Sequence, residues 1–411
     1  MSYDVAIVGL GRVGLPLALC FADHGLRVRG IDDDRERLAA LRARSMPFLE
    51  TGAQELLERA ELDLSEEIRD AAQATHIVIT LGTPSFSQIE IDISQIRQAL
   101  DELRDELRAG HSLILRSTVA PGTTDYVAAY LRRHTELEIG SEVYVAHAPE
   151  RIAAGRFIEE IHSLPCIVGG VGTDSGAVVG RLFAVFGAPI VQTTPVQAEL
   201  AKIWTNILRY TNFALPNLLM MDCEQYGANV FDVIELINRD YPRGGIAKPG
   251  FTAGTCLRKD FAFSEERSYA PGMLLAVSRV NESVPLFLIR GLRRRIGSLE
   301  GRRICVLGLA FKADTDDERD SLSHKLVRLL ERELADVAVH DPLIHAATIP
   351  FPEALNDADA VIVATNHSAF RTPAALAQIV AGAAPECLIV DPWDCWGFGE
   401  LFVYTAELPQ P

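Results

Sequence analysis

The chain has 411 residues, of which 48% are hydrophobic and 23% are charged, a composition typical of soluble globular proteins. This length exceeds what one hydrophobic core usually covers, so two or three domains are expected. The formal net charge of −17 argues against a nucleic acid or an anionic membrane as partner, because either polyanion would be repelled over a long range.

The apolar stretch from Val5 to Ala22 has the composition of a signal or membrane segment. Arg12 lies in its middle, three glycines interrupt it, and Asp4 precedes it in place of a basic leader, so we expect a cytoplasmic protein. The seven cysteines include no CxxC pair, which favours a reducing compartment over a disulfide framework. No Cys/His cluster has the spacing of metal ligands, so no metal is expected.

The first half of the chain alternates strand-like apolar runs with helical patterns. Strand-like runs occupy residues 4–10, 27–34, 75–84 and 112–122, and helical patterns cover 14–25 and 93–110. Further strand-like runs at 143–151, 165–172 and 188–194 extend the series. Apolar strands joined by helices predict a parallel sheet that is covered on both faces.

The pattern changes after about residue 195. Helices are predicted over 195–227, 229–241 and 272–297, and Pro216 predicts a kink in the first of them. A strand at 303–311 then opens a second α/β series, with strand-like runs at 336–342, 358–367 and 387–393. The sequence therefore predicts an α/β protein with two Rossmann-like, doubly wound parallel-sheet domains, at 1–196 and 299–411, joined by a helical middle domain at 197–298 that contains a long central helix.

The stretch "GLGRVG" at residues 9–14 follows a predicted strand and opens a predicted helix. Such glycines let the backbone approach a pyrophosphate, the helix start supplies N–H donors, and an acid at the end of the next strand, here Asp32, binds a ribose diol. The alternative is a merely tight strand-to-helix turn. Asp32, Asp33 and Asp34 would repel a 2′-phosphate, so the pattern predicts NAD rather than NADP. The residues assigned to this site are Gly9, Gly11, Arg12, Val13, Gly14 and Asp32, with Thr83 at the end of another strand.

The second α/β series has a related turn in "VLGLAFKADTDDERDS", residues 306–321. Gly308 keeps one glycine of the motif, and Lys312 enters the turn, which suits a phosphate site built from a helix start and one cation. The alternative for so acidic a stretch is a charged, solvated loop.

Two features outside these turns carry side chains that suit catalysis. Lys202 and Asn206 share a face of the predicted long helix, which is otherwise so apolar that the lysine is expected to point into a cleft rather than into solvent. Cys256 lies in a glycine-rich loop, with Arg258 and Lys259 after it. Nearby cations favour the thiolate nucleophile, although free cysteines are more often small buried hydrophobes.

These segments together resemble the UDP-glucose/GDP-mannose dehydrogenase family of nucleotide-sugar dehydrogenases. The resemblance covers nearly the whole chain and rests on motifs that occur in the family's order: "VGLGRVGLPLA", "GTP", "RSTVAPGT", "HAPERIAAG", "AELAKIWTN", "PGFTAGTCLRKD", "RVNESVP" and "GLAFKADTDDERDS". It implies NAD-dependent oxidation of the C6 alcohol of a nucleotide sugar to a carboxylate, in two steps. "PERIAAG" and "LPCIVGG" look more like the UDP-N-acetylhexosamine branch, which favours that substrate over UDP-glucose or dTDP-glucose.

The resemblance also implies the roles of single residues. Cys256 would be the nucleophile that forms a thiohemiacetal and then a thioester, and Lys202 and Asn206 would stabilise the oxyanion. Asp260 and Glu150 would handle protons and position water with Thr118. The implied cofactor contacts are Arg37, Thr118, Lys259 and Arg319, and the implied substrate contacts are Arg151, Lys202, Asn206, Arg243, Gly250, Phe251, Phe311 and Lys312. A homodimer or larger homo-oligomer, formed through the middle helix, is implied as well.

Two other classes of function stay open at this point. A β-hydroxyacid or 6-phosphogluconate type dehydrogenase also combines an NAD lobe with a helical Lys and Asn four residues apart, but it needs neither the thiol nor a second nucleotide lobe. A non-catalytic NAD- and nucleotide-sugar-binding regulator would have no need for so complete a catalytic set. Formation of NADH on nucleotide sugars separates these classes.

Overall fold

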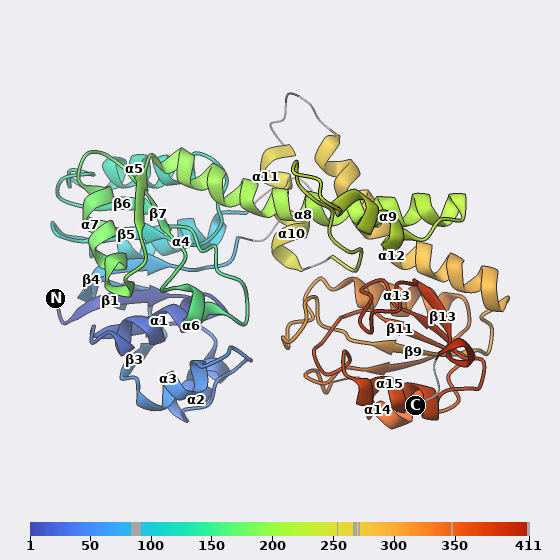
Figure 1. Ribbon diagram of the computed structural model, residues 1–411. Helices are drawn as coiled ribbons and strands as arrows, with labels where there is room; N and C mark the ends of the chain where they lie inside the picture. The colour runs from blue at the N-terminus through green and yellow to red at the C-terminus, as the bar shows by residue number, and fades with distance from the viewer. Residues whose placement is uncertain (84–91, 253, 266–268, 270–271, 347, 409–411) are drawn as a thin grey trace. The chain divides into compact units, whose positions relative to one another are not determined.

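The computed structural model describes residues 1–83, 92–252, 254–265, 269, 272–346 and 348–408 (Figure 1). The chain forms two compact units, Met1–Thr205 with Ala262–Arg267, and Asn206–Phe261 with Ser268–Pro411. The boundary at Thr205 falls inside α8 (Pro195–Tyr226), the long helix that the sequence predicted. The finer boundaries at 196 and 298 stay predictions.

The first unit is built on a sheet with the strand order β3-β2-β1-β4-β5-β6-β7-β8. Its strands are β1 (Tyr3–Val8), β2 (Val28–Ile31), β3 (Leu62–Ser65), β4 (Ala74–Ile79), β5 (Ser112–Leu115), β6 (Tyr144–His147), β7 (Cys166–Gly170) and β8 (Ile190–Thr193). Neighbouring strands pair in parallel, which confirms the prediction, except that β6 and β7 are antiparallel. This exception arises because the chain enters β7 from the end at which β6 finishes, since the segment between them does not carry the chain back to the other end of the strands.

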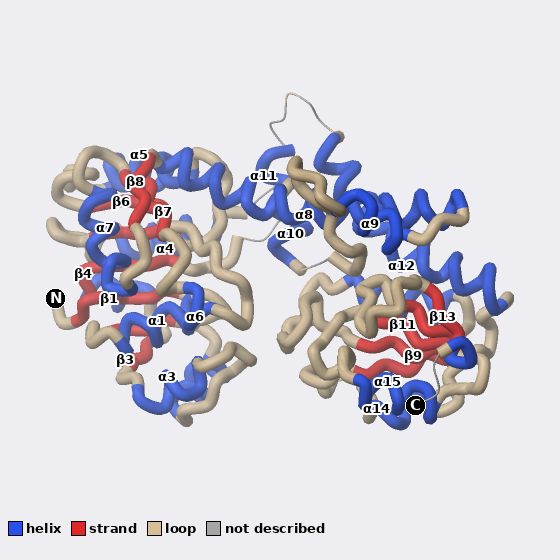
Figure 2. Tube along the Cα trace, viewed as in Figure 1, coloured by secondary structure: helices blue, strands red, loops and turns tan. Residues whose placement is uncertain are grey.

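Helices cover both faces of this sheet (Figure 2). Along β1, Val5 and Ile7 pack into one hydrophobic core, whereas Ala6 and Val8 pack into a second core on the opposite face of the sheet. This alternation is the period of a strand that is buried on both sides. The helices are α1 (Gly14–Asp23), α2 (Arg35–Arg42), α3 (Ala53–Arg59), α4 (Ser94–Leu103), α5 (Thr123–His134), α6 (Phe157–Glu160), α7 (Ser175–Phe183) and α11 (Ala262–Glu265), with the 3-10 turns η1 (Ile68–Gln73) and η2 (Ala184–Phe186).

The second unit contains the rest of α8, a small helical part and a sheet with the order β10-β9-β11-β12-β13. Its other elements are α9 (Val230–Asn238), α10 (Thr255–Asp260), α12 (Met273–Ile296), β9 (Arg303–Leu307), α13 (Leu322–Arg332), β10 (Asp336–His340), α14 (Phe351–Leu355), β11 (Ala360–Val363), α15 (Pro373–Gly382), β12 (Leu388–Val390), β13 (Phe402–Tyr404) and η3 (Thr405–Glu407). The final strand, β13, is antiparallel to β12, and the others pair in parallel. Along β9, Ile304 and Val306 face α12 and α13, and Cys305 and Leu307 face α14 and α15.

Two details of the middle segment differ from, or go beyond, the sequence prediction. Residues Thr255–Asp260, which we expected in a loop, form the short helix α10. Both long helices carry an internal proline, Pro216 in α8 and Pro285 in α12, and each helix continues past its proline. The kink at Pro216 stays a prediction. Among the described residues, no helix is long and apolar enough to cross a membrane.

Candidate active site

The glycine-rich turn joins β1 to α1 and leaves one side of its backbone open. Gly9 has a φ of +96°, and a Cβ on Gly14 would lie 1.9 Å from the Gly9 carbonyl oxygen, so the start of α1 packs directly on the turn. A Cβ on Gly11 would meet no atom of the described chain within 4 Å. A glycine is therefore needed at position 14 by the fold itself, whereas the space at position 11 suits a phosphate that approaches the backbone.

Asp32 lies at the end of β2 and fixes the same turn. Its carboxylate accepts hydrogen bonds from the Leu10 N–H at 2.6 Å and the Asp34 N–H at 2.9 Å. Arg37 donates to both Asp32 oxygens at 2.7 Å and pairs with Asp34 at 3.0 Å. The guanidinium is thus held by two carboxylates, so its expected contact with the adenosine end of the cofactor stays a prediction.

A cavity of about 420 Å³ opens beside this turn. Gly9, Gly11, Asp32 and Arg37 line it together with several acids, Asp33, Glu66 and Glu102. Such a lining accepts a ribose diol and repels a 2′-phosphate, so the residues present fit NAD. Arg12 lies with its guanidinium 5.0 Å from the ring centre of Phe48, and Val13 directly precedes α1.

The ends of β4 and β5 bring two further predicted residues together. The Thr83 hydroxyl donates to the Thr118 carbonyl oxygen at 2.7 Å. The turn that follows Thr118 is held by Glu199 of α8, which accepts from the Gly122 N–H at 2.7 Å and the Thr124 N–H at 2.8 Å. Burial raises the pKa of Glu199, and these hydrogen bonds oppose the rise. Sequence reasoning missed Glu199, although it lies in the "AELAK" motif one turn before Lys202.

Glu150 is held in place by a buried ion pair. Arg116 donates to its Oε2 at 2.6 Å, and the N–H groups of Arg151 and Ile152 donate to its Oε1 at 2.7 Å each. Arg116 also lies 4.8 Å from the ring centre of Phe183. This structural partner was not predicted, and the role of Glu150 in positioning water stays a prediction. The Arg151 side chain hydrogen-bonds the Pro165 carbonyl.

Lys202 is half-buried on α8. Burial lowers the pKa of His147 to about 3, and the positive charges of Arg116 and Lys202 add to this effect. Lys202 therefore lies within electrostatic range of the end of β6, where ligands collect in a parallel sheet. The neighbouring Trp204 is exposed rather than buried, so the apolar composition of the helix does not by itself explain where the lysine lies.

In the second unit, Cys256 is exposed near the start of α10. Gly254, just before the helix, has a φ of +95°, and a Cβ there would lie 2.6 Å from the ring of Phe311. The ring of this predicted substrate residue thus packs beneath the turn that presents the thiol. Arg258 does not remain a free cation beside Cys256, because its Nε pairs with Glu282 at 2.7 Å.

Two predicted catalytic residues meet one helical turn after Cys256. The Nδ2 of Asn206, on α8, donates to Oδ2 of Asp260, at the end of α10, at 2.6 Å, and both residues are buried. The ring of Tyr210, one turn after Asn206 on α8, stacks on Phe261 with 6.2 Å between the ring centres. Because Cys256 and Asp260 are four residues apart in α10, they share a helix face.

The turn after β9 repeats the design of the NAD turn. Asp341, at the end of β10, accepts from the N–H groups of Leu309 at 2.7 Å and Ala310 at 3.1 Å, as Asp32 accepts from Leu10. His367 also lies 3.1 Å from Asp341. Asp341 was not assigned to a site from the sequence, although an acid at the end of a strand was the signal that identified Asp32. The turn fixes the backbone that carries Phe311 and Lys312.

The remaining predicted residues lie in the second unit. Hydrogen bonds from Arg319 to Asp317 raise the pKa of Arg319 although burial lowers it, and the charge of Cys256 adds to the rise. This arginine is therefore a cation within electrostatic range of Cys256. Arg243 is exposed against Tyr241, and Phe251 is buried in the core. The contacts predicted between the cofactor and both Lys259 and Arg319 stay predictions.

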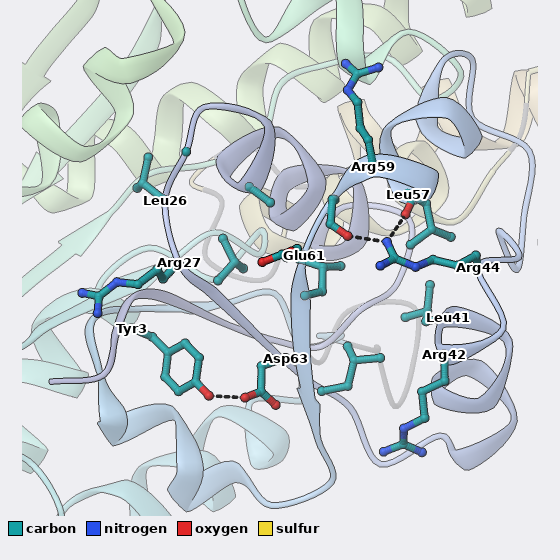
Figure 3. A pocket seen from close by; sticks show the side chains of 16 residues that line it. Tyr3, Leu26, Arg27, Leu41, Arg42, Arg44, Leu57, Arg59, Glu61 and Asp63 are labelled. Atoms are coloured by element: carbon teal, nitrogen blue, oxygen red, sulfur yellow. Dashed lines mark hydrogen bonds between the residues drawn. The ribbon is translucent and has the colours of Figure 1, made fainter.

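Another cavity, of about 960 Å³, lies at the opposite edge of the first sheet, where β1, β2 and β3 begin (Figure 3). Four arginines line it, but three already have partners. Arg27 pairs with Asp4, Arg59 pairs with Asp23, and Arg44 donates to the carbonyls of Leu57 and Ala60 at the end of α3. These arginines stabilise the fold, and we assign no ligand to the cavity.

Three family models match the chain in order. They are the NAD binding domain at residues 3–187, the central domain at 196–283 and the UDP binding domain at 305–397 of the UDP-glucose/GDP-mannose dehydrogenase family. The chain belongs to this family. The resemblance inferred from the motifs is thereby confirmed, the cofactor is NAD, and the protein is a nucleotide-sugar dehydrogenase rather than a binding regulator. Among the described residues, no cluster of side chains is suited to hold a metal ion.

Relatives within the nucleotide-sugar dehydrogenases are similar over nearly the whole chain. A UDP-N-acetyl-D-mannosamine dehydrogenase of Pyrococcus horikoshii is 31% identical over 379 residues, 90% of this chain and 90% of the relative. The solved structure of a UDP-D-ManNAc dehydrogenase from that organism has a TM-score of 0.84 at 30% identity, covering 92% of this chain and 93% of that one. A UDP-glucose 6-dehydrogenase of Haloferax volcanii is 30% identical over 397 residues, 89% of this chain and 92% of the relative.

Proposed function

We propose that this dehydrogenase oxidises the C6 alcohol of a UDP-N-acetylhexosamine to the carboxylate, with two NAD⁺ consumed per sugar. The observation that carries the proposal is the arrangement on α10, where the exposed Cys256 lies one turn before Asp260, which Asn206 holds at 2.6 Å. A thiol that is exposed next to a fixed, buried carboxylate suits covalent catalysis with proton transfer.

The chemistry proceeds in two oxidations. Bound NAD⁺ would supply the hydride acceptor for each of them. In the first, the C6 alcohol loses a hydride and a proton and becomes an aldehyde. The Cys256 thiol then adds to the aldehyde carbonyl and gives a thiohemiacetal, which loses the second hydride and a proton and becomes a thioester. Water hydrolyses the thioester to the carboxylate and releases the thiol.

The roles of the other residues follow the charges that develop. Lys202 and Asn206 stabilise the oxyanion, because a cation and an amide donor are the groups that an alkoxide needs. Asp260, which Asn206 holds at 2.6 Å, carries protons. Glu150 positions water with Thr118, because Arg116 and two backbone N–H groups fix its side chain. Lys312 and Phe311 contact the UDP-sugar.

The relatives support this choice of sugar. Several UDP-N-acetyl-D-mannosamine dehydrogenases match over about nine-tenths of the chain, and the "PERIAAG" segment that carries Arg151 resembles that branch. The second candidate is UDP-glucose, which the similarity to the Haloferax volcanii enzyme favours. We also propose that the enzyme works in the cytoplasm, where the thiol of Cys256 stays reduced.

A homodimer formed through α8 is part of the proposal. Apolar side chains of this helix are more than one-third exposed in the single chain, which is unusual for a long helix that has no partner. In the second unit they are Leu208, Leu215 and Leu218, exposed by 60%, 52% and 44%. Their spacing of seven and three residues places them on one stripe of the helix.

The test is NADH formation by the purified protein on a panel of UDP-, dTDP- and GDP-sugars, with product analysis. We expect two NADH and one carboxylate per UDP-N-acetylhexosamine, and loss of the acid product in Cys256→Ala. Preferred turnover of UDP-glucose would move the assignment to the second candidate. Acid formation at the wild-type rate by Cys256→Ala would overturn the thioester mechanism.

A further inference from the structure

A chain of three hydrogen bonds, formed by groups that have no catalytic role in the proposed reaction, anchors the segment that carries Cys256. The Gly250 N–H donates to Asn217 Oδ1 at 2.9 Å. The Asn217 Nδ2 donates to Asn281 Oδ1 at 2.9 Å, and the Asn281 Nδ2 donates to the Tyr210 carbonyl oxygen at 3.1 Å. Asn217 belongs to α8 and Asn281 to α12, and both side chains are fully buried.

The two ends of this chain determine the orientation of both side-chain amides. The Gly250 N–H can only donate, and the Tyr210 carbonyl can only accept. Asn217 and Asn281 must therefore each accept one hydrogen bond through the side-chain oxygen and donate one through the side-chain nitrogen. A carboxylate at either position would bring two oxygens face to face in a buried site, and no rotation of the remaining amide repairs that contact.

The other end of the segment is held by the same face of α8. Asn206 binds Asp260, and Tyr210 stacks on Phe261. Asn206, Tyr210 and Asn217 are separated by four and seven residues, which puts them on one side of a helix. One helix face therefore holds both ends of residues 250–261, and Cys256 lies between the two attachments.

The position of Gly250 is fixed from the opposite side as well. A Cβ on Gly250 would lie 2.5 Å from ring atoms of Trp393. The backbone at Gly250 is thus enclosed between Asn217 and the Trp393 ring, and it has no room to move toward that ring.

We propose that Asn217 and Asn281 are positioning residues that set the place of Cys256 for its attack on the sugar aldehyde. This inference rests on the proposed function, because it requires Cys256 to be the nucleophile. Attack needs the sulfur at near-contact distance and in line with the carbonyl, and a misplacement of about 1 Å can lower the rate about 100-fold.

The test uses the full-length enzyme with Asn217→Asp and the smaller Asn281→Ser. The control is Asp232→Asn, because Asp232 is exposed on α9 and lies outside both this hydrogen-bond chain and the exposed stripe of α8. We expect kcat for oxidation of the sugar aldehyde to fall about 10- to 100-fold in both variants, with a smaller change in KM. The affinity for NAD, whose turn lies in the first unit, stays at the wild-type value and reports that this unit is folded. Hydroxylamine then traps more free aldehyde than in the wild type.

A second measurement needs no sugar. The rate at which iodoacetamide alkylates Cys256, followed by mass spectrometry of its peptide, is expected to change at least about threefold in both variants and not in Asp232→Asn. Unchanged alkylation together with unchanged aldehyde oxidation would overturn the inference, and so would an equal loss of NAD binding and of both oxidations. If the wild type gives no NADH on any sugar, the proposed function fails and the alkylation rates alone decide this inference.

Discussion

The side chains of Asn206 and Asp260 are joined by a hydrogen bond of 2.6 Å, although 54 residues separate them in the sequence. Asn206 comes from the long helix α8, and Asp260 ends the short helix α10 that presents Cys256. Two residues that the motifs singled out independently therefore form one buried polar pair, one helical turn from the thiol.

Replacement of Asp260 tests this pair. Asp260→Asn keeps the shape of the side chain but removes its capacity to carry a proton, so we expect kcat for acid formation to fall about 100-fold or more. The affinity for NAD is expected to stay the same. The control is Asp232→Asn, on an exposed position of α9. Steady-state kinetics with product analysis measures the effect, and wild-type turnover in Asp260→Asn would remove this residue from the mechanism.

The glycine turn predicts two different outcomes for two similar variants. In Gly14→Ala the new Cβ would lie 1.9 Å from the Gly9 carbonyl oxygen, so we expect the fold to lose about 1–3 kcal/mol or more. In Gly11→Ala the Cβ meets no described atom within 4 Å, so stability should hold while NAD binding weakens about tenfold or more. Thermal unfolding and NAD titration separate the two effects. Equal losses of stability would contradict the assignment of Gly11 to the cofactor.

The ion pair of Asp32 and Arg37 suggests how the preference for NAD over NADP can be changed. Asp32→Asn keeps an acceptor for the Leu10 N–H but removes a charge, which leaves Arg37 less neutralised. We expect kcat/KM for NAD to fall and the NADP-to-NAD ratio of kcat/KM to rise about tenfold or more, because arginine can pair with a 2′-phosphate. Asp33→Asn, in the same cavity, should change the ratio less. An unchanged ratio would show that Asp32 does not select the cofactor.

Asp341 predicts a pH dependence of stability in the second unit. Burial raises the pKa of Asp341, but hydrogen bonds from His367, Leu343 and Leu309 outweigh it and lower the pKa to about 2. Because the folded pKa lies below the ordinary value near 3.9, the ionised form stabilises the fold at neutral pH, and this contribution of about 2 kcal/mol is lost as the pH falls from about 5 to 2.

The difference in urea stability between the wild type and Asp341→Asn measures this effect. Fluorescence of Trp393, which packs in the second unit, reports the transition. We expect the difference to shrink as the pH falls below about 4. A difference that stays constant down to pH 2 would contradict the lowered pKa.

The exposed stripe of α8 predicts the oligomeric state. Leu208→Glu places a charge at a side chain that is 60% exposed in the single chain, so the monomer should remain stable while a dimer that buries this stripe dissociates. Light scattering after size-exclusion chromatography measures the mass. Glu224→Gln would not serve as a control, because Glu224 pairs with Arg294 and Arg295 in the same chain, so Asp232→Asn is used again. A wild-type monomer would refute this part of the proposal.

Much of the fold could be predicted because its signals are local. Apolar runs that alternate with helical patterns gave the parallel sheets, and the predicted helix at 195–227 is α8 at Pro195–Tyr226. The reversed direction of β7 was missed, since strand direction depends on where the chain re-enters the sheet. Helix α10 was missed because six residues with mixed polarity show no period, and Gly254 and the packing of Phe311 determine where it starts.

The partners of the site residues were the part that sequence reasoning could not supply. Arg116 for Glu150, Glu199 for the turn after Thr118, and Asn217 with Asn281 for Gly250 all come from distant segments. Whether two groups form a hydrogen bond depends on their distance to within a few tenths of an ångström and on the angle between them. A pattern of residues in the sequence gives neither quantity. The chemistry of each side chain could be inferred, but its geometry could not.

The sequence by itself indicated the family of this protein, because motifs such as the glycine turn, the Lys-Asn pair and the segment around Cys256 each lie within a few residues and occur in the family's order. Only the tertiary structure decided which of these side chains are held by partners. Arg37 and Arg258 are engaged by carboxylates, Asp260 is bound by Asn206, and Cys256 lies between two attachments to one helix face. Local residue types specify what a group can do, and long-range packing fixes where it is held.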